Sequence, residues 1–383
     1  MTHSLTVDFV ASEAEIPAPL WDACFPPPLE GRWFYHALEN SGLEDQLTFR
    51  YALLREQGQA VGIAPLFLMD VPIDIVVPEA VLPLFAIPGR LFPSLLYQRT
   101  LLVGSPCTDE GGIGLLPGVD RRAMLLCLQR ALEMESRRLR APMLVWKDFP
   151  DSYALDLQWL AAQAGLFRMV SYPGTLVDLP GLGKAEYFAS LKVKRRHNLK
   201  KKLRLSAERV ASHLEVVQHP EGRVLDEIFG LYLQTHARSD VQLERLSRRF
   251  FEHMAAQPLS HFLTLREDAS GEMIAFMLCF DMGGFVFNKY IGLDYARPKE
   301  WLLYFRIWEA AVDWALSRGV TAIQSGQTCY TAKIEMGHRL VPLTNYCRHR
   351  NHLLHHVYAA VARRISWATL DEGLKRHDPT GNS

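Results

Sequence analysis

The segment that decides the fold runs from Gly271 to Asn351 and opens with Gly-Glu-Met-Ile-Ala-Phe-Met-Leu-Cys-Phe at 271–280. A second apolar run, Phe-Val-Phe-Asn-Lys-Tyr-Ile-Gly-Leu-Asp, follows at 285–294. Two such runs, rich in β-branched and aromatic residues and separated by a Met-Gly-Gly turn at 282–284, are typical of paired strands. We therefore predict a β-hairpin here.

The residues after this hairpin predict two further helix–strand pairs. An amphipathic pattern over Trp301–Ser317 predicts a helix that ends at Gly319. A short strand at 321–325, a short helix at 330–336 and a last strand at 341–348 follow. In the order β-β-α-β-α-β, a crossover helix covers one face of the sheet and a ligand crevice opens at the strand ends.

This element order, together with the residues in it, resembles the GNAT acyltransferase superfamily. The resemblance is strongest to the branch that holds the Fem-type peptidoglycan aminoacyltransferases and their acetyltransferase-like relatives. It covers 180–351 well and the N-terminal half more loosely, and it implies an α/β fold with mixed sheets in two tandem GNAT-like domains packed side by side. The residues that carry it are Ser190–Lys200, Phe250, Phe251, Asn288–Gly292, Trp308, Glu309, Gly326, Gln327, Tyr330, Lys333, Gly337 and His349.

Length and composition agree with a two-domain protein. The 383 residues are too many for one typical core. A formal net charge of zero argues against a protein built mainly to coat nucleic acid. None of the six cysteines forms a CxxC pair, and no run of about 18 apolar residues is present. Residues 1–20 have no apolar core of the kind found in signal peptides, so we expect none. We expect a cytoplasmic protein that does not contact the membrane.

The two halves of the chain repeat one pattern. The N-terminal half also has a hairpin-like run, then a helix, a strand, a second helix closed by glycine, and a strand-like run, at 55–69, 121–138, 142–146, 155–164 and 167–177. Duplication of one α/β unit explains this order, and two unrelated units with a common pattern are the alternative.

The repeat and a turn-rich break at 180–183 predict the domain boundaries. We expect an N-terminal GNAT-like domain at 1–180, a C-terminal GNAT-like domain with the active site at 181–350, and a helix and tail at 351–383. The proline-rich segment 71–118 is additional material that could shape an acceptor pocket.

The densest cluster of charge is the basic run Lys192–Arg204. On a helix, Arg195 falls on an apolar stripe, and a buried arginine needs a partner. We predict that Arg195 and Arg196 bind either an anionic ligand or a structural carboxylate, and the resemblance places this run beside the substrate cleft. The other basic side chains have an ordinary reading as a solvated face. The stripe consists of Phe188, Leu191, Leu199, Leu203 and Val210.

The resemblance implies an active site where two central strands splay apart, so that backbone amides receive the acyl carbonyl. The strand ending at Asn288–Gly292 and the strand 321–325 are the two candidates, with Tyr290, Gln327 and His349 as further binding residues.

The short helix at 330–336 carries the predicted catalytic residues. We predict that Tyr330 protonates the leaving group, that Lys333 pairs with a phosphate or carboxylate, and that Glu335 deprotonates the attacking ammonium. The alternatives are a packing tyrosine, a surface lysine and an ordinary polar helix face.

One departure from the superfamily leaves the donor open. A CoA-using GNAT enzyme has a glycine-rich loop before its long helix, where helix-terminal amides hold the pyrophosphate. This chain has Gly-Leu-Asp-Tyr-Ala-Arg-Pro-Lys-Glu-Trp at 292–301 instead, in which Arg297 and Lys299 could serve as point charges. We expect no permanently bound cofactor, and an acyl-CoA, an aminoacyl-tRNA or a carrier-protein thioester as co-substrate.

Histidines near the C-terminus are a weaker signal. His352 and His356 have the spacing of metal ligands on a helix, but no Cys, Asp or Glu follows at useful spacing, so no metal is expected. His338, next to Gly337, is interpreted as a helix cap or a surface residue.

The function predicted from the sequence is N-acyl transfer from an activated donor to a small-molecule amine or amino-acid acceptor. One alternative is a Fem-type aminoacyltransferase that uses aminoacyl-tRNA and binds tRNA through its basic residues. The other is a non-catalytic GNAT-like binding protein, which the missing pyrophosphate loop motivates.

Overall fold

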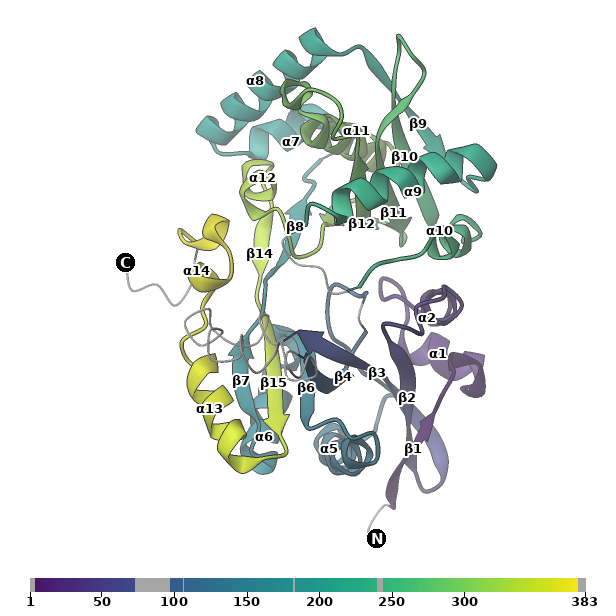
Figure 1. Cartoon of the computed structure of the whole chain (residues 1–383), viewed down its shortest axis with the longest axis vertical. Coiled ribbons are helices and arrows are strands. Elements are labelled where there is room, and N and C mark those ends of the chain that lie inside the picture. Colours follow the sequence, from purple (N-terminus) through teal and green to yellow (C-terminus); the bar gives the residue numbers. More distant parts are fainter. Residues whose placement is uncertain (1–3, 73–96, 106, 182, 240–243, 378–383) are drawn as a thin grey trace, which may run out of the picture. The chain divides into compact units, whose positions relative to one another are not determined.

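The structure is a computed structural model that describes residues 4–72, 97–105, 107–181, 183–239 and 244–377. The chain divides into two compact units, shown in Figure 1, each of which has its own mixed β-sheet. Unit 1 consists of 1–39, 43–173 and 342–383, and unit 2 of 40–42 and 174–341.

The sheet of unit 1 has the strand order β1-β2-β3-β4-β6-β15-β7, with β5 paired to β3. Its neighbours are antiparallel except for β4 and β6, which run parallel. The strands are β1 (Leu5–Val10), β2 (Thr48–Glu56), β3 (Gln59–Pro72), β4 (Tyr97–Val103), β5 (Gly114–Leu115), β6 (Met143–Pro150), β7 (Phe167–Val170) and β15 (Leu343–His349).

Helices cover both faces of this sheet. The apolar side chains of α5 and α6 pack with Leu54, Leu101 and Trp146 in one core, and α1 packs with Tyr51 and Ile63 in another. Asp120 caps the first turn of α5, where its carboxylate accepts from the Ala123 amide at 3.1 Å. The helices are α1 (Ala18–Cys24), α2 (Arg32–Glu39), α5 (Arg121–Arg138), α6 (Ala154–Ala164), α13 (His352–Ala362) and α14 (Trp367–Leu370).

The sheet of unit 2 has the order β14-β8-β13-β12-β11-β10-β9, and its parallel pair is β12 with β13. Strand β11 is buried along almost its whole length, as expected of a central strand covered on both faces. The strands are β8 (Gly174–Asp178), β9 (Ser212–Val217), β10 (Ser260–Glu267), β11 (Met273–Asp281), β12 (Phe285–Leu293), β13 (Ala322–Gln324) and β14 (Arg339–Val341).

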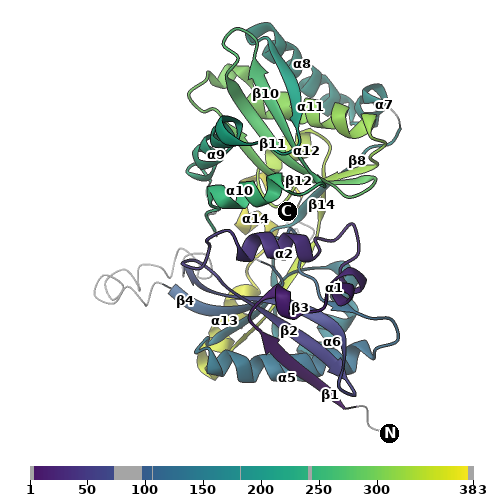
Figure 2. The same ribbon diagram turned by 90° about the vertical axis from the view of Figure 1, so that its right-hand side faces the viewer.

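Figure 2 shows the two faces of this second sheet: α7, α8 and α11 lie on one side, and α9 with α10 on the other. The first group forms the main core of unit 2 with alternate residues of β11, such as Ala275 and Met277. The helices are α7 (Lys184–Ser190), α8 (Val193–Arg209), α9 (Gly222–His236), α10 (Arg248–Ala255), α11 (Leu303–Ser317) and α12 (Tyr330–Glu335).

The two sheets have equivalent strand orders, with one exchange. β8 follows β7 in the chain but joins the sheet of unit 2, and β15, near the C-terminus, joins the sheet of unit 1. The predicted run 167–177 is therefore two strands in two sheets, and the last strand pairs with β6 and β7. The observed units thus differ from boundaries at 180 and 350, because strand pairing at long sequence separation is not visible in local periodicity.

Most predicted elements are present within a residue or two. The α/β class with mixed sheets in two GNAT-like domains is confirmed. All five side chains of the predicted stripe are buried. The tail 351–375 is divided into α13, α14 and a 3-10 turn rather than one helix. Of the proline-rich segment 71–118, residues 73–96 and 106 lie outside the described residues.

Candidate active site

The central feature of unit 2 is the place where β12 and β13 separate. The two strands pair in parallel over three residues, and the last pair is Phe287 with Gln324. Strand β13 ends there, whereas β12 continues to Leu293 along β11. In the described part of the chain, no strand pairs with the β13 side of β12 beyond Phe287. This segment of β12 therefore lies at a sheet edge that β13 does not cover.

A β-bulge lies in the separating part of β12. Leu278 of β11 is opposite Tyr290, but the next residue, Cys279, is opposite Asn288, so that Lys289 is the additional residue. A bulge bends its strand and increases the local twist. The bend occurs where β12 leaves β13, and it helps to explain why the two strands separate.

Strand β8 fixes the path of the chain after β13. The Ser325 amide donates to the Thr175 carbonyl at 2.9 Å, and the Thr175 hydroxyl donates to the Gly326 carbonyl at 2.8 Å. Gly326 has a φ of 66°, which glycine adopts without the steric cost that other residues incur. The turn thus holds the chain on β8, away from β12.

Lys333 of α12 reaches back to this turn. Its side chain is buried, with 5% exposure, and its Nζ donates to the carbonyl of Ser325. The alternative interpretation of Lys333 as a surface lysine is therefore wrong. A buried amino group is costly unless it is hydrogen-bonded, so its position next to the strand ends requires this bond.

His338 completes a hydrogen-bonded ring with Ser325 and Lys333. Its Nδ1 lies 2.9 Å from the Lys333 carbonyl, which can only accept, so Nδ1 carries the proton. Nε2 then accepts from the Ser325 hydroxyl at 3.0 Å. Burial, followed by the neighbouring Lys333, lowers the pKa of His338 to about 3. The imidazole is therefore neutral and fixed in one tautomer.

Aromatic side chains from α7 and α11 support this ring. The Trp308 ring lies against His338 with 4.6 Å between centroids, and its Nε1 donates to the Tyr187 hydroxyl at 3.2 Å. Tyr187 in turn donates to the Met336 carbonyl at 2.6 Å, near the end of α12. The resemblance residue Trp308 thus positions α12 through packing and two hydrogen bonds.

The other two predicted catalytic residues also lie on α12. Tyr330 is its first residue and is buried. The Glu335 carboxylate forms an ion pair with Lys202 of α8 at 2.5 Å, and Lys202 also lies over the ring of Phe305. Glu335 is therefore held by α8, in an ion pair that sequence reasoning did not predict.

The predicted binding residues on β12 and after β13 have different surroundings. Asn288 is half-buried, and its side chain has no hydrogen-bond partner among the residues that the structure describes. Tyr290 packs edge-on against Phe250 at 5.5 Å and contacts Tyr232 and Phe251, as part of the aromatic layer under α9 and α10. Gln327 is half-buried in the turn that follows Gly326.

Arg297 is surrounded by carboxylates. It forms ion pairs with Asp294 at 2.9 Å, with Glu267 at 3.3 Å and with Glu272. These partners raise its pKa despite the opposing effect of burial. A guanidinium that already has three carboxylate partners is a poor substitute for the pyrophosphate loop, because an anionic ligand must compete with all three.

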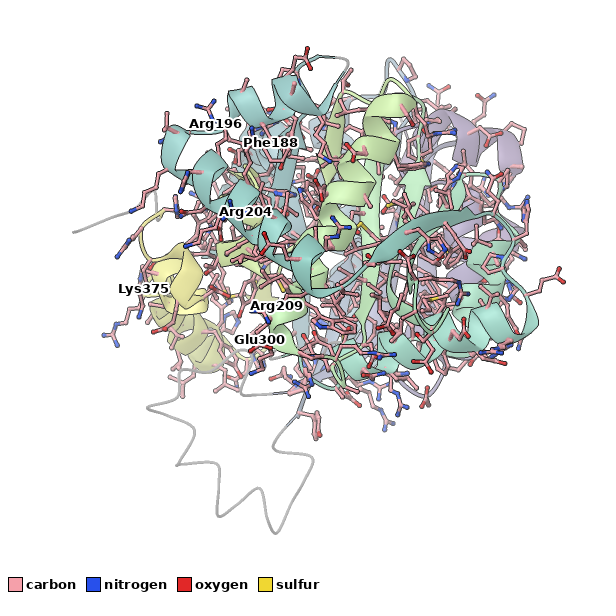
Figure 3. All side chains as sticks on the ribbon, turned by 90° about the horizontal axis from the view of Figure 1, so that it is seen from above. Phe188, Arg196, Arg204, Arg209, Glu300 and Lys375 are labelled. Carbon is pink, nitrogen blue, oxygen red and sulfur yellow. The ribbon has the colours of Figure 1, made fainter. Side chains whose placement is uncertain are left out.

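The basic run forms α8, along which Arg196, Arg204 and Arg209 are labelled in Figure 3. Arg195 is half-buried rather than buried on the stripe, because its position lies at the edge of the covered face. It makes no hydrogen bond or ion pair with a described residue, and Arg196 donates only to the Ala189 carbonyl, at 3.5 Å. The predicted structural carboxylate is thus absent from the described chain.

His349 does not join these residues, because it is the last residue of β15 and belongs to unit 1. Its ring contacts Tyr358 of α13 with 5.6 Å between centroids, and burial lowers its pKa. Across the described residues, no group of three or more metal-ligating side chains is placed to hold a metal ion.

Sequence reasoning missed three residues near the strand ends. The sequence predicts a cap or surface residue at His338, but it is buried, with 3% exposure. For Ser325 the sequence predicts only the end of a strand. Tyr304, near the start of α11, has its pKa raised by burial and then by Cys329 and Tyr295, so its phenol stays protonated. The one sequence signal for a buried His338 is its place after a strand, a short helix and a glycine. That order is too common to identify a site residue.

The low pKa of His338 predicts a pH-dependent stability. In the unfolded chain a histidine titrates near 6.5, so below this pH only the unfolded state takes up the proton. The stability that the neutral His338 contributes is thus fully present above pH 6.5. It is lost as the pH falls toward about 3. We expect the free energy of unfolding of wild type to fall between pH 7 and 5 by about 2 kcal/mol more than that of His338→Gln.

Denaturant unfolding at the two pH values measures this difference. The subtraction is necessary because burial also lowers the pKa of His261, His349 and His355. Parallel curves for wild type and variant would contradict a neutral, buried His338.

Comparison with known proteins agrees with this geometry. Residues 193–328 match the family described as acetyltransferase (GNAT) domain. No curated protein is significantly similar in sequence.

Several solved structures share the fold over most of the chain. L-PGS from Bacillus licheniformis is 14% identical, with a TM-score of 0.52 and coverage of 89% of this chain and 97% of that one. FemX is 11% identical, with a TM-score of 0.55 and coverage of 84% and 93%. A tandem GNAT protein from the clavulanic acid biosynthesis pathway is 10% identical, with a TM-score of 0.51 and coverage of 91% and 99%.

The fold and the separated strands define a tandem GNAT architecture of the Fem-like kind. Within it, the segment 193–328 is the part that matches the acetyltransferase (GNAT) domain family. The class of chemistry associated with this family is acyl transfer.

Proposed function

We propose that the protein transfers an acyl group from an activated donor to an amine at the ends of β12 and β13. The observation that carries this proposal is the separation of the two strands after Phe287 and Gln324, with a bulge at Lys289. The stretch of β12 that β13 does not cover can pair with an extended donor arm and place its carbonyl near α12. No covalent intermediate and no metal is required.

In the proposed reaction, the amine nitrogen attacks the acyl carbonyl carbon, and the bond from this carbon to the leaving sulfur or oxygen breaks. Backbone amides of β12 and Lys333 Nζ donate to the oxyanion. Tyr330, or the protonated phenol of Tyr304, gives a proton to the leaving group, and Glu335 takes the ammonium proton through water. Positioning and electrostatics supply the rate.

The ring of Ser325, Lys333 and His338 supports the role of Lys333. Each of its hydrogen bonds fixes an atom at the end of β13 or in α12. A neutral imidazole adds no second positive charge to that of the amino group. The ring therefore holds Lys333 in one place, as a preorganised donor must be.

The preferred donor is an acyl-CoA or another thioester, and the acceptor is a small-molecule amine or an amino acid. The ion pairs of Arg297 imply that the recognition of a CoA pyrophosphate depends on other groups.

An aminoacyl-tRNA is the second candidate, and α8 favours it. Residues 192–209 contain nine basic residues and one acidic residue, a net charge of +8 in a chain whose net charge is zero. Arg195 and Arg196 have no carboxylate partner in the described chain, so they could pair with phosphates.

The first experiment is a thermal-shift measurement on the full chain with acetyl-CoA, longer acyl-CoAs and an aminoacyl-tRNA, each at low and moderate salt. A bound donor is expected to stabilise the folded chain by about 2.7 kcal/mol at one hundred times its Kd, and thereby to raise the melting temperature. An aminoacyl-tRNA shift should weaken steeply with salt and in the double variant Arg195→Gln, Arg196→Gln. Acyl transfer to an amine is then assayed with the donor that binds.

The two donors give different results. If an acyl-CoA raises the melting temperature equally in wild type and in the α8 double variant, the donor is a thioester. If an aminoacyl-tRNA raises it and added salt removes the effect, the second candidate is supported. If no donor shifts the melting temperature and no amine is acylated, the enzyme proposal fails and the binding-protein alternative gains support.

A further inference from the structure

Among the described residues, helix α13 of unit 1 packs through one face. His355 lies edge-on against Phe167 of β7 with 5.1 Å between ring centroids, Tyr358 contacts His349 of β15, and Ala362 is buried. These side chains recur at three- and four-residue spacing, so they define one side of the helix. On the opposite side of α13, large side chains are exposed in the described part of the chain.

The open side presents large apolar residues. Leu353 is 74% exposed, Val357 50% and Leu354 42%. Leu353 and Val357 are four residues apart and therefore neighbours on the helix surface. A single exposed leucine is ordinary, but three large apolar side chains on successive turns of one helix form a patch.

Arginines precede and follow this patch in the sequence, and the surrounding sequence contains no carboxylate. Residues 342–370 contain four arginines and no Asp or Glu. Arg350, Arg363 and Arg364 are exposed, and none of the three forms an ion pair with a described residue. The fourth arginine, Arg348, pairs with Glu133 at 2.9 Å. Exposed leucine and valine bordered by unpaired arginines are the pattern of a helix that lies in a membrane interface.

We propose that α13 docks the protein on an anionic lipid surface. Leu353, Leu354 and Val357, which we call the α13 patch, enter the headgroup region, while Arg350, Arg363 and Arg364 pair with lipid phosphates. The contact is peripheral, since no helix in the described chain is long and apolar enough to cross a membrane. It differs from the sequence-based expectation of no membrane contact. It does not depend on the proposed acyl transfer.

A second copy of the chain is a less suitable occupant of the α13 patch. A symmetric dimer would bring the three arginines of one copy close to the same arginines of the other, and like charges repel. A stable interface also needs about 20 to 30 residues from each partner, whereas the patch has three large apolar side chains. A lipid surface needs only a few inserted side chains and a favourable charge.

The test is co-sedimentation of the full chain with vesicles of phosphatidylcholine alone and of phosphatidylcholine with about one-third phosphatidylglycerol, at low salt. We expect binding to the anionic vesicles that weakens as salt is added. The double variant Leu353→Ser, Val357→Ser should lower the partition constant at least about tenfold. Arg363→Gln and Arg364→Gln should each lower it about fivefold.

Matched controls separate α13 from the rest of the surface. Leu155→Ser on α6 removes a leucine that is 80% exposed outside the patch, and Arg137→Gln removes an exposed arginine of α5. Both should leave the partition constant unchanged. Because α8 is also basic, the double variant Lys200→Gln, Lys201→Gln is included.

Three outcomes would overturn the proposal. In the first, the wild-type chain does not sediment with anionic vesicles. In the second, only the α8 variant sediments less, and in the third, the α13 variants sediment as much as wild type. Analytical ultracentrifugation tests whether a second copy of the chain occupies the patch. If the wild-type chain is a dimer and Leu353→Ser is a monomer, the patch is a dimer interface and the lipid proposal fails.

Discussion

Replacing Lys333 with methionine is expected to lower kcat/KM for acyl transfer about 10²- to 10³-fold, the usual effect of removing one preorganised donor from an oxyanion. Lys333 Nζ lies at the Ser325 carbonyl, where β13 ends and β12 continues along β11 without it. Methionine has a similar length but no donor, so the buried space stays filled. The rate is measured with whichever donor raises the melting temperature of the wild-type chain.

The control for this variant is Lys184→Met. Lys184 is paired with Glu309 and Asp313 of α11, so its loss removes the same charge from an ion pair outside the ring of Ser325, Lys333 and His338. We expect its kcat/KM to stay within a factor of about two of wild type, since surface ion pairs contribute little. A Lys333→Met enzyme with wild-type activity would remove Lys333 from the mechanism.

Replacing Trp308 with alanine is expected to destabilise unit 2 by about 3–5 kcal/mol, the typical cost of truncating a large buried aromatic residue. The indole is 2% exposed, packs on His338 and donates to Tyr187. The loss is measured by hydrogen exchange of amides in α11 and β11, because two compact units need not unfold together.

Phenylalanine at position 308 separates packing from hydrogen bonding. Trp308→Phe keeps a ring against His338 but leaves the Tyr187 hydroxyl without its donor, so we expect a loss of about 1–2 kcal/mol. Equal losses for the alanine and phenylalanine variants would mean that the indole N–H, rather than the packing, supports α12.

Local signals in the sequence predicted the individual elements well. Gly319 and Gly337 end α11 and α12 with φ of 71° and 97°, values that glycine tolerates and other residues rarely adopt. The 3.6-residue period placed the buried stripe of α8, although its two first members lie on α7 and in the connection between the helices. Each of these signals depends only on residues within a few positions of one another.

The strand ends of the candidate site were predicted in part. The resemblance pointed to 288–292 and 321–325, and β12 and β13 do separate there. It could not reveal that three carboxylates surround Arg297, because Glu267 and Glu272 come from the preceding hairpin. Nor could it reveal that Glu335 pairs with Lys202, a residue 133 positions earlier in the chain.

The sequence by itself determined the type, the order and most ends of the helices and strands, since capping, turn chemistry and periodicity are local properties. Only the tertiary structure decided that β8 and β15 exchange between the two sheets, because strands of similar composition can pair at either sheet edge. The same holds for burial. Lys333 and His338 resemble surface residues in the sequence, and they become a buried hydrogen-bonded pair only when α7, α11 and β8 close around them.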